Sequence, residues 1–205
     1  TLSVHLAYSM SKLGYSVALI DLDPQGSLGL FCGLPLAEAN QTTAVVLNDD
    51  FSGDWPLIPC WSDHIDKVEV CRGGLILAKT TQEISLHPRG SYLLVDKLQD
   101  YPLPHDLIIF DCPATLGPLP LIAVAASTHL LVPVQLQPKS IQGSAKLLEW
   151  LYAVQKQLRL NRAPQILGFV PNQYDQKRAA QRQIFEQLPK KLASMNIKCF
   201  SPVRD

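Results

Sequence analysis

Short apolar runs of this chain end repeatedly at an acidic or amide side chain, and helical patterns separate them. Runs that are apolar throughout are typical of strands buried on both faces, and their alternation with helices predicts parallel strands. We therefore expect an α/β fold with a mostly parallel twisted sheet flanked by helices on both faces. The runs lie at residues 16–20, 107–110, 130–134 and 166–170, with a fifth at 197–200, and the first four end at or near Asp21, Asp111, Gln135 and Asn172.

Amphipathic helical spacing occupies much of the sequence between these runs. The segment from residue 36 to residue 74 reads differently, and we expect a short helix, loops and an edge strand at 68–70 there. Pro189 is expected to break or kink the last helix. The expected helices cover residues 2–13, 118–127, 141–158 and 176–195.

The polar residues that follow the apolar runs predict where a ligand binds. In open parallel sheets, ligands bind beyond the carboxyl ends of the strands. We expect the polar side chains to cluster at that edge of the sheet. They are Asp21, Asp23, Asp111, Gln135 and Asn172.

Composition and charge limit the classes of function that this chain can have. Eighteen Lys and Arg balance eighteen Asp and Glu over 205 residues, so any nucleic-acid binding would need a local basic patch. The chain contains no run of 18 apolar residues, so we expect no transmembrane helix. The five cysteines are scattered, odd in number and without a C-x-x-C pair, which favours a reduced cytosolic setting without a disulfide or zinc framework.

The string Asp21-Leu22-Asp23-Pro24-Gln25-Gly26-Ser27 carries two carboxylates two residues apart at a strand end. Such a pair suits a hydrated Mg²⁺, or one acid on the metal and the other on a water molecule. The alternative is that Asp21 caps the following turn and Asp23 is simply solvated.

Asp111 closes a second hydrophobic strand in Asp111-Cys112-Pro113. An acid in that position is what a Walker B motif has, where it holds Mg²⁺. A strand-terminal cap is the alternative here too. Two acid-terminated strands in one parallel sheet favour the metal interpretation more than either strand does alone.

Three stretches together resemble the ParA/MinD family of deviant-Walker ATPases. They are residues 1–7, the string 19–27 that contains Asp-Leu-Asp-Pro-Gln-Gly-Ser, and residues 109–113. In that family the Walker A loop directly precedes the first helix, and Thr1 aligns with its last threonine. The resemblance implies that residues 1–205 form a single P-loop NTPase domain that lacks the N-terminal Walker A loop and a C-terminal segment.

The resemblance also implies roles for the acids and for the nucleotide contacts. Asp23 would orient or activate the attacking water, Asp21 would help organise Mg²⁺, and Asp111 would hold Mg²⁺ from behind its water shell. Thr1 would touch the α-phosphate at a helix N-terminus. Asn172 would read adenine, with an ordinary turn residue as the alternative, and residues Pro202 to Arg204 would cover the base.

One departure from the family pattern concerns Lys139. After the strand at 130–135, ParA proteins carry an acidic-aromatic pair, whereas this chain has Gln135-Leu136-Gln137-Pro138-Lys139. The departure is similar to the McdA branch, which spaces carboxysomes along the nucleoid, and implies that Lys139 neutralises phosphate charge across a dimer. The alternative is a solvated lysine.

The resemblance implies a cytoplasmic, nucleoid-associated ATPase that uses ATP and Mg²⁺. It would form a homodimer with ATP, bind DNA non-specifically through late basic residues, and meet a small McdB-like adaptor on its cargo, with no membrane partner. A solvated helix face is the alternative for those basic residues. Two other functions stay open, namely plasmid or chromosome partition and a non-catalytic ATP-gated DNA-binding scaffold. The late basic residues are Lys177, Arg178, Arg182, Lys190, Lys191 and Lys198.

Overall fold

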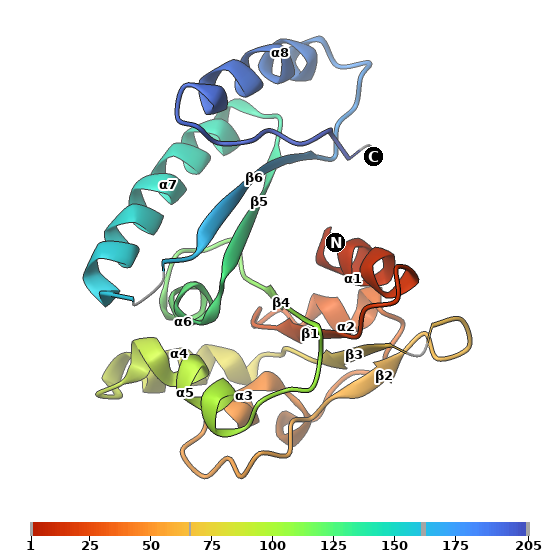
Figure 1. Ribbon diagram of the computed structural model, residues 1–205, viewed down its shortest axis with the longest axis vertical. Helices are drawn as coiled ribbons and strands as arrows, with labels where there is room; N and C mark the ends of the chain where they lie inside the picture. The colour runs from red at the N-terminus through yellow and green to blue at the C-terminus, as the bar shows by residue number, and fades with distance from the viewer. Residues whose placement is uncertain (1, 66, 161–162, 204–205) are drawn as a thin grey trace. The chain divides into compact units, whose positions relative to one another are not determined.

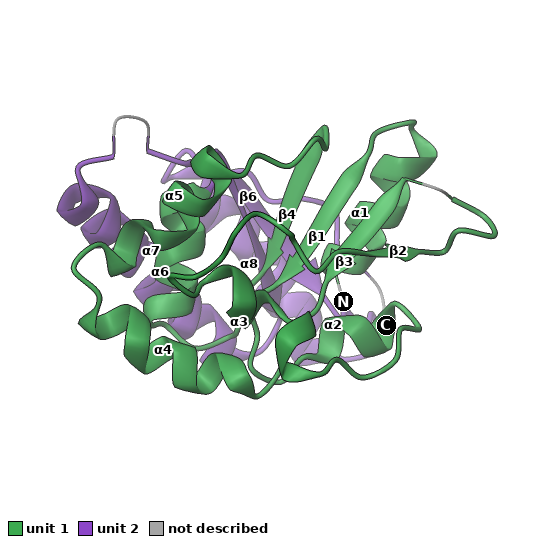
Figure 2. Ribbon diagram, turned by 90° about the horizontal axis from the view of Figure 1, so that it is seen from below, with its two compact units in different colours: residues 1–126 green, residues 127–205 purple. Residues whose placement is uncertain are grey.

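A computed structural model describes residues 2–65, 67–160 and 163–203 of the chain. These residues belong to two compact units, residues 1–126 and residues 127–205 (Figure 2). Thr1 and Arg204, for which the sequence predicts nucleotide contacts, lie outside the described residues.

Unit 1 is built on a four-stranded sheet in the order β2-β3-β1-β4 (Figure 1). Strand β1 is parallel to both of its neighbours, β3 and β4, and β2 is antiparallel to β3. Every residue of β1 is buried, as expected of a central strand between two helical layers. The strands are β1 (Val17–Asp21), β2 (Ile58–Cys60), β3 (Val68–Cys71) and β4 (Leu107–Asp111).

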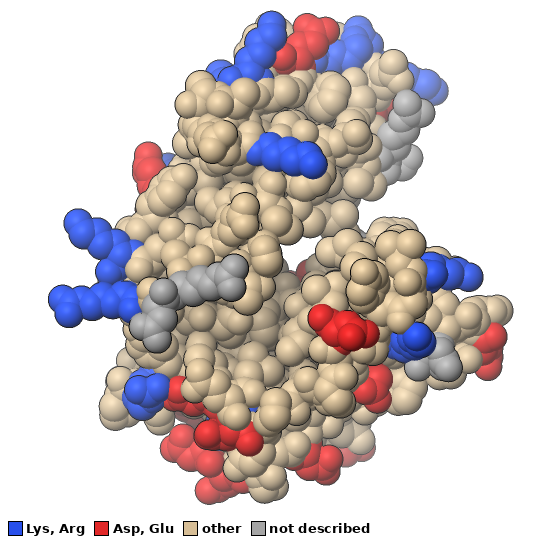
Figure 3. Space-filling model, viewed as in Figure 1, with Lys and Arg blue, Asp and Glu red and all other residues tan. Residues whose placement is uncertain are grey.

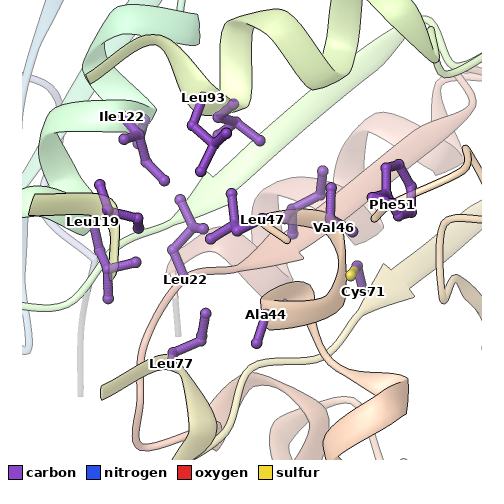
Figure 4. Close-up of a cluster of buried hydrophobic side chains, with 14 of the residues drawn as sticks. Leu22, Ala44, Val46, Leu47, Phe51, Cys71, Leu77, Leu93, Leu119 and Ile122 are labelled. Atoms are coloured by element: carbon purple, nitrogen blue, oxygen red, sulfur yellow. The ribbon is translucent and has the colours of Figure 1, made fainter. Parts of the chain in front are cut away.

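Side chains of β1 point alternately into two apolar clusters, because successive strand residues face opposite sides of a sheet. Ile20 belongs to the cluster that also holds Leu22 and Ile122 (Figure 4), whereas Leu19 packs with Ala7 in the other cluster. The predicted α/β sheet flanked by helices is thus confirmed. The helices of unit 1 are α1 (Leu2–Lys12), α2 (Ser27–Phe31), α3 (Thr43–Val46), α4 (Ile76–Leu86), α5 (Leu93–Asp100) and α6 (Pro118–Ala126), with 3-10 helices η1 (Ala39–Gln41) and η2 (Gly90–Tyr92).

Unit 2 contains two parallel strands, β5 (His129–Gln135) and β6 (Gln165–Asn172), and two long helices, α7 (Pro138–Leu158) and α8 (Ala179–Ala193). The strand register pairs Gln135 with Asn172 at the carboxyl ends. Helix α8 continues through Pro189 and does not end there. None of the helices in the described ranges is long and apolar enough to cross a membrane.

Two sequence-based expectations about strands are wrong. The strand at 68–70 is internal, because β2 pairs with its outer side. The sequence did not predict β2, because it has only three residues and contains Pro59, which an edge strand tolerates. Residues 197–200 make a single parallel bridge from Cys199 to Phe169 instead of a strand. The segment still follows β6, but Pro171 and Pro202 have no N–H to donate, so the ladder stays irregular.

Candidate functional site

Asp21 is the last residue of β1, and its side chain is fully buried. Its backbone pairs in register with Asp111, the last residue of β4. Two carboxylates therefore lie at adjacent carboxyl ends of parallel strands, where the sequence predicted a metal-binding edge.

Backbone N–H groups surround the Asp21 carboxylate. The N–H of Asp23 donates to Oδ1 at 2.8 Å and the N–H of Leu28 donates to Oδ2 at 3.3 Å, and the nearby backbone of Gly73 also lowers the pKa of the carboxyl group. Burial nevertheless raises the pKa of Asp21 to about 6, because desolvation outweighs these hydrogen bonds and the nearby Asp111 adds repulsion. The carboxylate is held in place but is costly to ionise.

Asp111 is partly buried and accepts a 2.6 Å hydrogen bond on Oδ1 from the hydroxyl of Ser3 in α1. Burial is the main cause of its raised pKa, and the carboxylate of Asp23 adds to it. Its Oδ2 receives no hydrogen bond from the described residues. Oδ2 of Asp111 is therefore the carboxylate oxygen that is available to a ligand.

Asp23 begins the turn that leads into α2. The N–H of Gln25 donates to its side chain at 2.9 Å, and the N–H of Gly26 donates to its carbonyl at 2.9 Å. Gly26 has φ 62°, the left-handed region that favours glycine. The carboxylate of Asp23 stays partly exposed, in contrast to Asp21, so it can reach water.

Gly73 and Thr43 belong to the site although the sequence analysis gave them no role. A Cβ on Gly73 would lie 2.8 Å from Oδ2 of Asp21, so only glycine lets the backbone approach this closely. The hydroxyl of buried Thr43 donates to the carbonyl of Asp21 at 2.8 Å. The Gly73-Gly74 pair, one residue after a strand, was the available sequence signal for Gly73, whereas nothing local marks Thr43.

The carboxylates fit a hydrated magnesium ion. Across the described ranges no group of three or more His, Cys, Asp or Glu side chains is arranged as a metal cage. Mg²⁺ typically keeps several waters and uses one or two carboxylates together with substrate phosphates. A buried pair of repelling carboxylates with a free oxygen is chemically suited to that kind of binding.

The other predicted residues lie in unit 2. Asn172 ends β6, and Pro202 lies beside it, because Val203 donates its N–H to the carbonyl of Pro171 at 2.8 Å and accepts from the N–H of Tyr174 at 3.1 Å. The structure thus brings Asn172 and Pro202 together. Lys139 is exposed in the first turn of α7, where no acidic residue accompanies it.

The zero net charge hides a division between the two units. Residues 1–126 contain six Lys and Arg against fourteen Asp and Glu, whereas residues 127–205 contain twelve against four. Figure 3 shows blue side chains over α8 and the end of α7, and red ones over unit 1 near α4 and α5. Unit 2 therefore carries a net excess of basic residues that the whole-chain composition does not reveal.

Comparison with known proteins gives a matching family model and sequence relatives that include chromosome-partitioning proteins. A family model described as an AAA domain matches residues 1–166. The chain is 30% identical to the sporulation initiation inhibitor protein Soj of Bacillus subtilis, over 93% of this chain and 73% of that protein. It is 29% identical to the chromosome-partitioning ATPase Soj of Thermus thermophilus, over 92% and 69%.

Solved structures share the fold. A substituted McdA of Cyanothece in complex with ATP superimposes with a TM-score of 0.85 at 16% identity, over 98% of this chain and 76% of that one. Cobyrinic acid a,c-diamide synthase of Mycobacterium smegmatis, with a bound ATP analogue and magnesium, superimposes with a TM-score of 0.81 at 23% identity, over 92% and 75%.

Replacing Asp21 with Asn should change how stability depends on pH. A folded-state pKa raised from 3.8 to about 6 stabilises the parent fully below pH 4, and this contribution is lost as pH rises through 6. From pH 4 to pH 7, the unfolding free energy of Asp21→Asn should therefore improve relative to the parent by roughly 2–3 kcal/mol. Urea unfolding in EDTA at each pH measures this.

Asp106→Asn is the control of opposite sign. Hydrogen bonds from Ser16 lower the pKa of Asp106, so this variant should lose stability relative to the parent as pH rises from below 4. Parallel pH curves for Asp21→Asn and the parent would contradict the account of a costly buried carboxylate.

Proposed function

The chain belongs to the ParA/MinD family of ATPases, with Soj-type relatives, and from this premise we propose that it binds ATP with Mg²⁺ and hydrolyses it to ADP and phosphate. The observation that carries the proposal is the register pairing of Asp21 with Asp111 at adjacent strand ends. Support also comes from the fold neighbours that hold ATP or an ATP analogue with magnesium.

In this proposal Asp111 and Asp21 would hold Mg²⁺, which would supply positive charge opposite the phosphates. Oδ2 of Asp111 would be open to the hydrated ion, and the N–H groups around Asp21 keep that carboxylate fixed. Asp23 orients the attacking water, which its partial exposure permits. Asn172 and Pro202 receive the adenine, and Thr1 and Arg204 are proposed to contact the phosphate and the base.

Asp23→Ala should retain ATP binding and lose most hydrolysis. Removing a group that positions the attacking water should slow turnover by roughly 10²–10⁴-fold. Phosphate release measured beside nucleotide titration separates the two effects. Asp63→Ala, which removes an exposed aspartate on the loop before β3, is the matched control, and parental turnover in Asp23→Ala would refute the assignment.

We further propose that Lys139 acts on the nucleotide across an ATP-bound dimer. Lys139 lies in the first turn of α7, where the positive end of the helix dipole disfavours a cation. An anion at that point would reverse the preference. Two facing ATP molecules would supply such an anion, and each charge-assisted contact is worth about 1.5–3 kcal/mol.

Lys139→Ala should weaken ATP-driven dimerisation more than it weakens ATP binding by the monomer. Sedimentation with a slowly hydrolysed ATP analogue reports dimerisation, and nucleotide titration of the dilute protein reports binding. Lys146→Ala removes an exposed lysine further along the same helix and should dimerise like the parent. If Lys139→Ala also dimerises like the parent, Lys139 is an ordinary surface residue.

We propose that unit 2 binds DNA without sequence preference. The excess of basic residues in unit 2 supports this, and the late lysines and arginines are all exposed. Arg178 is paired with Asp175 at 3.2 Å, and Arg182 donates to the carbonyl of Gln176. Lys190 and Lys191 in the last turn of α8 are therefore the better candidates for phosphate contacts.

DNA binding should require ATP and should weaken steeply with salt, because counterions are released. Replacing Lys190 and Lys191 together with Ala should reduce the slope of log affinity against log salt by about 2. Mobility shifts over a salt series with ATP or ADP measure this, with the unit 1 variant Lys79→Ala as the control. Equal binding with ADP, or a strong preference for one sequence, would contradict the proposal.

The cargo we propose is the carboxysome, and the observation that favours it is Lys139 in place of the acidic-aromatic pair of ParA proteins. Chromosome or plasmid partition is the second candidate, favoured by the names of the sequence relatives. Identifying the neighbouring gene separates these two candidates. A gene for a carboxysome adaptor would favour the first, and a gene for a centromere-binding protein would favour the second. Turnover with and without DNA and adaptor tests the third candidate, a non-catalytic scaffold.

A further inference from the structure

We propose that Arg72 is a positioning residue for ATP hydrolysis, which holds the turn after β1 in place through Gly73 and Thr43. The inference rests on the proposed function, because it concerns the same carboxylates. Arg72 directly follows β3, and the backbone of the next residue, Gly73, lies against the Asp21 carboxylate. Any movement of Arg72 is thus passed on to that carboxylate by one peptide unit.

Arg72 carries a buried charge without an acidic partner. The residue is 3% exposed, and no carboxylate of the described ranges forms an ion pair with it. Its Nε has no hydrogen-bond partner in that part of the chain. Burying a guanidinium in this way costs stability, so a smaller apolar residue would serve better if packing were its only task.

The guanidinium ties together two points of the loop after α2. Nη1 donates to the carbonyl of Pro35 at 2.8 Å, and Nη2 donates to Oε1 of Gln41 at 3.0 Å. The same Oε1 accepts from the N–H of Glu38 at 3.3 Å. The two Nη groups of Arg72 therefore fix the loop from 35 to 41. The two acceptors lie at separate places, so a single ammonium group could not bind both.

The stem and backbone of Arg72 complete the connection to Asp21. A Cβ on Gly29 of α2 would lie 3.3 Å from Cγ of Arg72, so the stem packs directly on the helix that follows the turn. The carbonyl of Arg72 accepts from the N–H of Thr43 at 2.8 Å, and Thr43 donates its hydroxyl to the carbonyl of Asp21. Arg72 thus contacts α2 and the loop after it through its side chain, and it is linked through its backbone to Gly73 and Thr43 beside Asp21.

For catalysis, the role of Arg72 is to keep the turn from Asp21 to Gly26 in a fixed position. A displacement of about 1 Å from a mutation outside the reacting groups can cost roughly 100-fold in rate. Arg72 touches no reacting group in this account, so its loss should lower kcat more than it changes the KM for ATP. A residue needed only for folding would instead lower the active fraction and leave the properties of the folded molecules unchanged.

The test compares Arg72→Lys, Gln41→Ala and Gln41→Glu with the parent protein. Arg72→Lys keeps the charge but loses the fork, and Gln41→Ala removes one acceptor at an exposed position. Both should lower kcat, Arg72→Lys by roughly 10- to 100-fold, with the KM for ATP within about twofold. Gln41→Glu restores an acceptor for Nη2 and should retain parental kcat.

Hydrogen exchange of the same proteins without nucleotide gives a readout that does not depend on turnover. The amides of Asp23 and Gly73 should exchange about tenfold faster in Gln41→Ala than in the parent, and at the parental rate in Gln41→Glu and in the control Asn40→Ala. The amide of Leu19 in the core of β1 should not change, because the sheet is intact.

Two results would overturn the inference. One is parental kcat and parental exchange in Arg72→Lys. The other, decisive if Arg72→Lys does not fold, is a Gln41→Ala protein that behaves like Asn40→Ala. A parent that hydrolyses no ATP would instead contradict the proposed function, while the exchange comparison would still decide whether Arg72 holds the turn.

Discussion

The surrounding structure has to offset the repulsion between the two carboxylates at the paired ends of β1 and β4, and their desolvation. Asp21 and Asp111 are brought together by strand register, and burial raises the pKa of both carboxyl groups. Backbone N–H groups around Asp21 and the hydroxyl of Ser3 compensate only in part. A site built this way is suited to a cation, because a positive charge would offset both the repulsion and the desolvation of the carboxylates.

The neighbours of the carboxylates follow from this constraint. Gly73 must be glycine because its backbone lies against Asp21, and Gly26 must turn the chain with a positive φ. Thr43 and Arg72 are buried as well and connect the turn to α2 and to the loop that follows it. Four of the eight buried polar or charged residues in the described ranges, Asp21, Thr42, Thr43 and Arg72, lie around this end of the sheet, whereas the rest of β1 is apolar.

The sequence predicted the parallel strands and the acidic ends well, because apolar runs and the residue that ends each run are local features. It could not predict the internal position of β3, since the short strand β2 that covers it contains a proline and shows no alternation. Thr43 and Arg72 were missed because their partners lie 22 to 37 residues away. The division of charge between the units was hidden by a net charge of zero and appeared only once the unit boundary was known.

The central claim is that Asp21 and Asp111 form the metal side of an ATP site. Crystals of the protein with ATP and Mn²⁺ test it most directly, because Mn²⁺ replaces Mg²⁺ and its anomalous scattering identifies the ion. The account predicts one strong peak beyond the carboxyl ends of β1 and β4, in contact with Asp21 or Asp111 directly or through one water. Nucleotide and Mn²⁺ bound together at a place where neither carboxylate nor its water reaches the ion would contradict it.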